Sequence, residues 1–286
     1  MVQRVGCLGP RAAFSHLVVE TFFGKNIEQI LYTTIPKCID AAANGEIDIA
    51  VVPIENTIEG TVNLTLDYLV HEQPLTIIGE IILPIQQHLM VHPSLKDDWK
   101  TIDRIYSHSH AIAQCHKFLH ETFANAAYEY SSSTSAAAEY ASKHPDERIG
   151  VVASELAAKE YGLEIVQKNI HDYPYNHTRF VILHPSREND LFQTEYKKEK
   201  EKTTLMITLP SDQSGALHQV LSAFTWRKLN LSKIESRPMK TGLGRYFFII
   251  DIDMLYDDVL IPGAIAELEA LGCSVKLLGS YGAYTI

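Results

Sequence analysis

The chain has no long apolar run, no closely spaced cysteine pair and a long stretch without lysine or arginine. Because no run of roughly 18 apolar residues occurs, no membrane-spanning helix is predicted. The first residues run straight into a predicted strand, without an apolar signal segment. The four cysteines, Cys7, Cys38, Cys115 and Cys273, are scattered without metal-ligand or disulfide spacing. This usage favours reduced, buried thiols in a cytoplasmic protein.

Lysine and arginine are absent from residues 38–95 altogether. The whole chain carries a formal net charge of −10 and has a pI near 5.7. This charge argues against nucleic acid or an anionic membrane as the main partner, and it gives an anionic ligand no long-range attraction. Any anion bound by this stretch must therefore be held by amides, hydroxyls and helix N-termini.

Apolar residues are plentiful enough for a large core, at 46% hydrophobic and 9% aromatic. The length of 286 residues leaves room for two domains or three lobes. Strand and helix patterns alternate up to about residue 185, and the apolar run Asp48–Ile54 is typical of a strand buried on both faces. Residues 1–185 are therefore predicted to form an α/β unit with a largely parallel sheet.

A charged run over residues 186–202 interrupts this pattern and is predicted to be a linker. The pattern restarts in residues 203–286. The predicted elements there are a strand at 203–209, a helix at 215–228, strands at 231–236 and 245–253, a helix at 262–271 and a strand at 275–279. This βαββαβ order is the ferredoxin-like plan.

Two polar clusters stand at the ends of apolar strands. The pentad Asn176-His177-Thr178-Arg179-Phe180 places an amide, a hydroxyl and a guanidinium in consecutive positions. Pro53-Ile54-Glu55-Asn56-Thr57 follows a buried strand, where open α/β sheets bind ligands. Arg179 is suited to binding a carboxylate through two parallel hydrogen bonds. The clusters together predict a site for a small anion between two lobes, in which Asn56 is a better ligand candidate than Glu55.

Three further clusters lie at predicted strand-to-helix turns. They are Gly9–His16, Ser107–His110 with Gln114 on the following helix, and Ser131–Ala137. Hydroxyls and free N–H groups at helix starts cap the helix by default, and they also hold carboxylates. His108, His110 and His116 have poor chelating spacing, so no metal site is predicted. No nucleophile elbow accompanies these residues, which argues against a Ser-His-Asp enzyme.

Taken together, these motifs resemble the prephenate dehydratase family, in the bacterial form that carries a C-terminal ACT domain. The resemblance covers nearly the whole chain. It is carried by Gly9-Pro10 with Phe14-Ser15-His16, Pro53-Ile54-Glu55-Asn56, Tyr106-Ser107-His108 with Gln114-Cys115, Thr134-Ser135-Ala136-Ala137, Asn176 with Thr178-Arg179-Phe180, Gly215-Ala216-Leu217 and Glu235-Ser236-Arg237-Pro238. The chain departs from the family at Ala12-Ala13, where Gly-Thr is usual, and at Ser109-His110, where Pro-Gln is usual.

The resemblance implies a bilobal α/β catalytic domain, folded like a type-2 periplasmic binding protein, over residues 1–185. Its lobes are expected at 1–80 with 163–185 and at 81–162, so that the chain crosses between them near 81–84 and near 162–166. A ferredoxin-like ACT regulatory domain is expected over 203–286. If the two domains are independent, removing residues 203–286 should leave catalysis intact.

The resemblance also implies the reaction, in which prephenate becomes phenylpyruvate, water and carbon dioxide without a cofactor or metal. Aromatisation drives this step, so the protein has to orient two carboxylates and help the ring hydroxyl to leave. Carried onto this sequence, the catalytic residues are Thr178 as hydrogen-bond donor to the leaving hydroxyl, Arg179 as carboxylate clamp, and Asn56. The substrate-binding residues are Ser107, Gln114, Thr134, Ser135 and Asn176.

Feedback control by L-phenylalanine at the ACT domain is a further implication, with the effector held between two ACT domains of a homodimer or homotetramer. The expected effector residues are Gly215, Ala216, Leu217, Asn230, Leu231, Ser232, Glu235, Ser236 and Arg237. Two alternatives stay open on the sequence. One is arogenate dehydratase, which acts on the amino-acid analogue of prephenate. The other is a sensor that binds an amino acid without catalysis.

Overall fold

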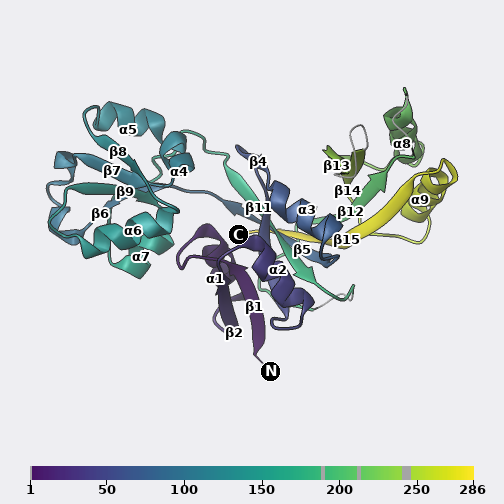
Figure 1. The fold of residues 1–286 in the computed structure, drawn as a ribbon, viewed down its shortest axis with the longest axis horizontal. Helices are drawn as coiled ribbons and strands as arrows, with labels where there is room; N and C mark the ends of the chain where they lie inside the picture. The colour runs from purple at the N-terminus through teal and green to yellow at the C-terminus, as the bar shows by residue number, and fades with distance from the viewer. Residues whose placement is uncertain (1, 188–190, 211–213, 240–245) are drawn as a thin grey trace.

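The computed structural model describes residues 2–187, 191–210, 214–239 and 246–286. Three bodies lie in a row in Figure 1, with the first lobe in the centre, the second lobe at one end and the C-terminal domain at the other. Arg245, which begins a predicted strand, and residues 188–190 of the predicted linker lie outside the described residues. No helix among the described residues is both long and apolar enough to cross a membrane.

The first lobe consists of a mixed sheet with helices packed against it. Its elements are β1 (Gln3–Leu8), α1 (Phe14–Phe23), β2 (Ile27–Tyr32), α2 (Ile35–Ala43), β3 (Ile49–Asn56), β4 (Gly60–Thr61), α3 (Asn63–His71), β5 (Thr76–Pro84) and β11 (His177–His184). The strand order is β5-β11-β3-β1-β2, in which β1 runs parallel to β2 and β3 while β11 runs antiparallel to both of its neighbours.

Local sequence explains why α2 begins where it does. The Thr34 hydroxyl accepts a hydrogen bond from the backbone N–H of Lys37 at 3.3 Å, and Pro36 occupies the first turn. A hydroxyl cap and a proline at this place are both favourable, because the first N–H groups of a helix have no partner within it. The buried face of α2, which includes Cys38 and Ile39, then packs on the sheet.

The second lobe has a sheet of its own in the order β10-β6-β9-β7-β8. Its elements are β6 (His88–Val91), short 3₁₀ turns at Pro93–Leu95 and Trp99–Thr101, β7 (Arg104–Ser107), α4 (Ser109–Gln114), α5 (His116–Thr122), β8 (Ala127–Tyr130), α6 (Thr134–Lys143), β9 (Ile149–Ala153), α7 (Glu155–Tyr161) and β10 (Glu164–Gln167). Its two apolar cores are separate from those of the first lobe.

The C-terminal domain has the predicted βαββαβ order. Its elements are β12 (Lys200–Thr208), α8 (Ala216–Thr225), β13 (Leu231–Pro238), β14 (Tyr246–Ile252), α9 (Leu260–Ala270) and β15 (Ser274–Thr285). The bilobal α/β architecture and the ferredoxin-like plan are therefore both confirmed. Helices α8 and α9 cover one face of this sheet, and the core between them includes Phe224 and Leu268.

The first lobe and the C-terminal domain share one continuous sheet, which the sequence does not predict. Strand β15 pairs in parallel with β5, so ten strands run through both bodies. In Figure 1 the long yellow β15 passes from the C-terminal domain into the central lobe, where the chain ends. One apolar core also spans the boundary, with Phe247 and Tyr281 packed in the same cluster as Leu66 of α3.

Several element boundaries differ from the predictions. The helical segment after β7 is divided at Cys115 into α4 and α5, and the strand predicted at 275–279 runs to Thr285. Strand β10 pairs with β6, so it belongs to the second lobe. The return crossing consequently lies between β10 and β11, and not near 162–166. The outgoing crossing follows Pro84, the last residue of β5.

Candidate active site

The site centres on a cross-strand pair formed by Asn56 at the end of β3 and Thr178 near the start of β11. The two residues are register partners in the antiparallel pair β3·β11. The Asn56 Nδ2 group donates to Thr178 Oγ1 and to Asn176 Oδ1, both at 2.9 Å. The Asn56 Oδ1 atom accepts from the backbone N–H groups of Ile58 and Glu59 at 2.9 and 3.0 Å. These four contacts fix the orientation of the amide.

A second amide pair extends this cluster to the other lobe. Asn176 is almost completely buried, and its Nδ2 group donates to Gln114 Oε1 of α4 at 3.1 Å. The Gln114 Nε2 group donates to Glu59 Oε1 at 3.4 Å. The predicted residues Asn56, Gln114, Asn176 and Thr178 therefore form one polar cluster across the lobe boundary, and we call it the amide cluster. Its members come from β3, α4, the return crossing and β11.

The Thr178 hydroxyl is arranged to donate. Its oxygen accepts from Asn56, so its own proton points elsewhere, and no acceptor for that proton is recorded within the described parts of the chain. A half-buried hydroxyl held in this way is ready to donate to an oxygen that gains negative charge.

Charge close to the amide cluster is sparse. The Glu59 carboxylate lies 3.5 Å from Nδ1 of His110, and both side chains are substantially exposed. Burial, followed by the nearby His110, lowers the pKa of His108, which keeps that imidazole neutral near pH 7. Recognition by the amide cluster itself therefore depends on neutral hydrogen-bond donors, as the lack of lysine and arginine in 38–95 predicts.

The remaining predicted substrate-binding residues lie in the second lobe and have protein partners. The Ser107 hydroxyl is fully buried and donates to the Val152 carbonyl at 2.5 Å. The Ser135 hydroxyl is buried and donates to the carbonyl of Arg11, and it lies 3.3 Å from the Tyr161 hydroxyl. Thr134 is half-buried in the first turn of α6. The structure thus groups Ser135 with the loop after β1 and does not place Ser107 or Ser135 in the amide cluster.

Arg179 faces the opposite side of the sheet from Thr178. Its guanidinium contacts the carboxylates of Glu55, Glu80 and Asp251, the last at 2.8 Å, and the side chain is 18% exposed. Burial lowers the pKa of Arg179, but attraction to Glu80 and Asp251 outweighs it and raises that pKa further above its usual range. The role of Arg179 as a carboxylate clamp stays a prediction, since in the structure its guanidinium is paired with protein carboxylates on the face opposite Thr178.

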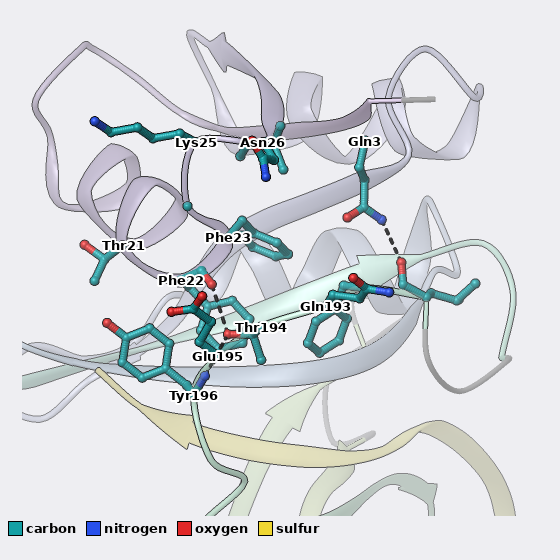
Figure 2. Close-up of a pocket in the computed structure, with 14 residues that line it drawn as sticks. Gln3, Thr21, Phe22, Phe23, Lys25, Asn26, Gln193, Thr194, Glu195 and Tyr196 are labelled. Carbon is teal, nitrogen blue, oxygen red and sulfur yellow. Dashed lines mark hydrogen bonds between the residues drawn. The ribbon is translucent and has the colours of Figure 1, made fainter.

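One cavity lies apart from the amide cluster. It has a volume of about 980 Å³ and is lined by residues at the end of α1, the start of β2 and the segment 191–196. Figure 2 shows Thr194 bonded to the carbonyl of Phe22, at 3.0 Å, and Gln3 bonded to that of Leu191, at 2.6 Å. The hollow is the place where the segment between the domains rests on the first lobe, and it contains none of the predicted site residues.

The predicted effector residues divide between two faces of the C-terminal domain. Gly215 has a φ of +85° and precedes α8, while Leu217, Asn230 and Ser232 are exposed. On β13, alternate residues face opposite ways, so Ser236 is exposed while Glu235 and Arg237 turn toward the first lobe. The Arg237 guanidinium contacts Asp67 at 2.7 Å, and Glu235 accepts from the Thr61 hydroxyl at 2.7 Å. The remaining members are Ala216, which is buried, and Leu231, which is half-buried.

Sequence reasoning does not single out Glu80, Lys202, Lys233 and Asp251, the four charged residues that join Arg179 and Glu55 between the domains. A signal was available for two of them. Glu80 and Asp251 are single acids within apolar strands, and an acid in such a place requires a cationic partner.

The structure has two α/β lobes joined by two crossings, a cluster of neutral hydrogen-bond donors between the lobes, and a ferredoxin-like domain. This combination defines a class of protein that binds a small ligand between its lobes under the control of an attached domain. The family model for prephenate dehydratase matches residues 5–188. The chain is 62% identical to prephenate dehydratase of Bacillus subtilis (strain 168), over 99% of this chain and 100% of that one. It is 44% identical to prephenate dehydratase of Lactococcus lactis subsp. lactis (strain IL1403), over 99% of both chains. The chain belongs to the prephenate dehydratase family.

Solved structures agree with the sequence comparisons. Prephenate dehydratase from Arthrobacter aurescens in complex with L-Phe superimposes with a TM-score of 0.83 at 34% identity, covering 97% of this chain and 89% of that one. Prephenate dehydratase from Staphylococcus aureus subsp. aureus Mu50 superimposes with a TM-score of 0.83 at 31% identity, covering 98% of this chain and 100% of that one. Both likenesses extend over the C-terminal domain as well as the two lobes.

Proposed function

We propose that this chain converts prephenate into phenylpyruvate, water and carbon dioxide, using the amide cluster as its reaction site. The family membership supports the reaction, and the hydrogen bond from Asn56 to Thr178 supports the site. Prephenate loses a carboxylate and a ring hydroxyl as its ring becomes aromatic. The protein therefore needs to hold the substrate and to assist one departing oxygen, without a cofactor.

In this proposal Thr178 donates a hydrogen bond to the ring hydroxyl as that group leaves. Threonine is a weak acid, so its contribution is a hydrogen bond that strengthens as negative charge grows on the leaving oxygen. Asn56 keeps the Thr178 proton directed outward because it donates to the threonine oxygen. Asn176 and Gln114 hold the two lobes in register around this pair.

We assign the carboxylates of the substrate to neutral donors on the second lobe. The first turn of α6, with Thr134 at its start, offers backbone N–H groups at the positive end of a ten-residue helix. The Ser133 hydroxyl caps this helix by accepting from the backbone N–H of Ala136. The Ser135 hydroxyl holds the helix start to the loop after β1, because it donates to the Arg11 carbonyl. Ser107 acts by holding β7 to β9, since its hydroxyl donates to Val152.

We further propose that the C-terminal domain is an ACT domain that binds L-phenylalanine and inhibits the reaction. The structure from Arthrobacter aurescens in complex with L-Phe supports this proposal. The exposed residues Gly215, Leu217, Asn230, Ser232 and Ser236 are available to an effector and to a second subunit in a homodimer or homotetramer. The four cysteines are all free and buried, which fits a reducing cytoplasm.

One assay tests the function. Purified protein is mixed with prephenate, and phenylpyruvate is followed with and without L-phenylalanine. Turnover that falls when the amino acid is added is the expected result. No turnover, with correctly folded protein, would contradict the proposed reaction, and turnover that ignores L-phenylalanine would contradict the proposed control.

Arogenate is the second candidate substrate, and one observation favours including it. The Glu59 carboxylate borders the amide cluster through Gln114 and is 41% exposed, so it could pair with the ammonium group that distinguishes arogenate from prephenate. The same assay with arogenate, following phenylalanine, compares the two substrates. A preference for arogenate that Glu59→Gln reverses would assign the chain to that reaction.

A further inference from the structure

The proposed catalytic pair, Asn56 and Thr178, has a second cross-strand pair next to it whose side chains point to the opposite face of the sheet. On β3 and β11, Thr178 is the register partner of Asn56, and Arg179 is the register partner of Glu55. Neighbouring residues of a strand face opposite sides of the sheet. Thr178 and Asn56 therefore point into the amide cluster, while the contact between Arg179 and Glu55 lies on the reverse face of the same two strands.

Two strands of the C-terminal domain contact the pair formed by Arg179 and Glu55. Asp251 of β14 binds the Arg179 guanidinium at 2.8 Å, and Lys233 of β13 binds the Glu55 carboxylate at 3.1 Å. Both of these side chains are largely buried, with 4% and 13% exposed. The two residues that flank the catalytic pair in sequence are thus each held by one side chain of the other domain.

These two contacts belong to a larger group of buried charges. Glu80 of β5 binds Arg179 and also Lys202 of β12, the latter at 2.7 Å. The cations in it are Arg179, Lys202 and Lys233, the anions are Glu55, Glu80 and Asp251, and Lys233 continues the group to Glu235 at 3.2 Å. Contacts between opposite charges allow such a group to stay buried, but a change in one member leaves a charge without its partner. The group is therefore sensitive to any shift of β13 or β14.

Strand β13 also connects this group with the proposed effector site. Lys233, Glu235 and Arg237 face the first lobe, whereas Ser232 and Ser236 on the other face are exposed. A ligand that moves the exposed face of a strand necessarily moves the buried face with it. A movement of β13 would reach the catalytic pair through the contact between Lys233 and Glu55, since Glu55 is the neighbour of Asn56 in β3.

We propose that Lys233 and Asp251 are positioning residues for the dehydratase reaction, through which the C-terminal domain sets the alignment of Asn56 and Thr178 from behind. This inference rests on the proposed function. In the uninhibited state the ion pairs around Arg179 and Glu55 hold β3 and β11 in the register that lets Asn56 direct the Thr178 proton. Effector binding shifts β13 and loosens that alignment. A ligand controls activity only when it binds one arrangement better than another, and here the arrangements differ in the contacts of Lys233 and Asp251.

The test uses Lys233→Met and Asp251→Asn in the full-length protein. Each variant removes one charge at nearly constant volume. Turnover of prephenate and calorimetric binding of L-phenylalanine are measured separately. We expect kcat to fall about tenfold with KM within about twofold, because alignment and not binding is lost. We also expect L-phenylalanine to bind within about threefold of the wild-type Kd while its inhibition shrinks to less than about twofold, since couplings of this kind are usually 5- to 150-fold.

A matched control and a rescue distinguish coupling from general damage. Arg227→Gln breaks a similar ion pair, Arg227 with Glu267, that lies entirely within the C-terminal domain, so both turnover and inhibition should stay at wild-type values. Lys233→Arg restores the charge and should restore both. If Asp251→Asn does not fold, Lys233→Met, which is nearer the surface, decides the question.

Three outcomes are separable. Wild-type protein without dehydratase activity would overturn the proposed function. Active and inhibited wild-type protein whose Lys233→Met and Asp251→Asn variants keep full inhibition would overturn this inference alone. Variants that lose L-phenylalanine binding together with inhibition would show that these residues belong to the effector site, which also overturns it.

Discussion

At the scale of single residues, the structure separates two neighbours that look alike in sequence. Thr178 and Arg179 are consecutive polar residues at a strand start, yet one lies in the amide cluster and the other among buried carboxylates. The period of two along a strand is the cause. The two residues are therefore expected to affect kinetics differently.

Thr178→Ala should lower kcat by about 10²–10³ while KM changes little, because the hydrogen bond from Thr178 strengthens only as the leaving oxygen gains charge. Steady-state kinetics with prephenate measure both constants. Thr178→Ser keeps the hydroxyl and is the control, with activity close to that of the wild type. A kcat near the wild-type value in Thr178→Ala would show that another group assists the leaving hydroxyl.

Arg179→Lys should lower kcat and thermal stability but leave KM almost unchanged. A lysine cannot reach Glu55, Glu80 and Asp251 together, since its ammonium is a single point charge without the planar fork of arginine. The comparison of KM with kcat is decisive here. If Arg179 were a clamp on a substrate carboxylate, as the sequence predicts, KM would rise steeply instead.

Much of the site can be predicted from the sequence. Asn56, Gln114, Asn176 and Thr178 all lie at element ends or on a crossing, and the structure brings these four together. Ser107 and Ser135 are different, because hydroxyls at strand and helix ends bind the nearest carbonyl as readily as a ligand, and only tertiary packing shows that Val152 and Arg11 take them.

At the scale of elements, the interface between the domains depends on two strands with different tasks. Strand β13 presents charged residues to the first lobe on every second position. Strand β15 contributes a sheet pairing instead, and its length could not be predicted, since the residues beyond Gly279 become a strand by pairing with β12 on one side and with the distant β5 on the other. Glycine positions there also allow close approach, because a Cβ at Gly279 would lie 2.1 Å from the carbonyl oxygen of Ile77.

The ionic face of β13 should make stability depend on acid. Desolvation raises the pKa of Glu235, but the hydrogen bond from Thr61 and the attraction of Lys233 outweigh this effect. The pKa of Glu235 therefore lies below its usual value of 4.5. A carboxylate with a depressed pKa contributes stability that is present above its ordinary value and is lost as the pH falls through the lower, folded-state value. Denaturant midpoints measured from pH 6 down to about pH 3 should therefore fall less steeply in Glu235→Gln than in the wild type. Parallel curves would exclude Glu235 from this effect.

At the scale of the whole molecule, the first lobe and the C-terminal domain are built as one unit. The chain shares one sheet and one apolar core across the domain boundary, and Arg179 depends on Asp251 for part of its charge balance. The charged segment 186–202 is predicted from the sequence as a linker, but strand β12 already begins at Lys200 within it, because pairing between distant strands is not visible in the local sequence.

Removing residues 203–286 should therefore abolish most of the activity along with the response to L-phenylalanine. The truncation uncovers the edge of β5, and exposed strand edges favour aggregation. It also removes Asp251 from Arg179, and it removes most of the strand that places Lys202 beside Glu80. Soluble yield and kcat of the truncated protein measure the effect. Supplying residues 191–286 as a separate chain should restore turnover, and a soluble truncation with wild-type kcat would show that the lobes are independent.

The pairing of β5 with β15 also has a consequence for biosynthesis. Strand β5 ends at Pro84 and its partner starts only at Ser274, so the ribosome adds about 190 residues before that edge can be covered. Until then this edge of β5 stays unpaired, and from the synthesis of β11 onward it is the open edge next to the strand that carries Thr178. Translation speed and chaperone supply should consequently limit the yield of this enzyme more than the stability of its finished fold does.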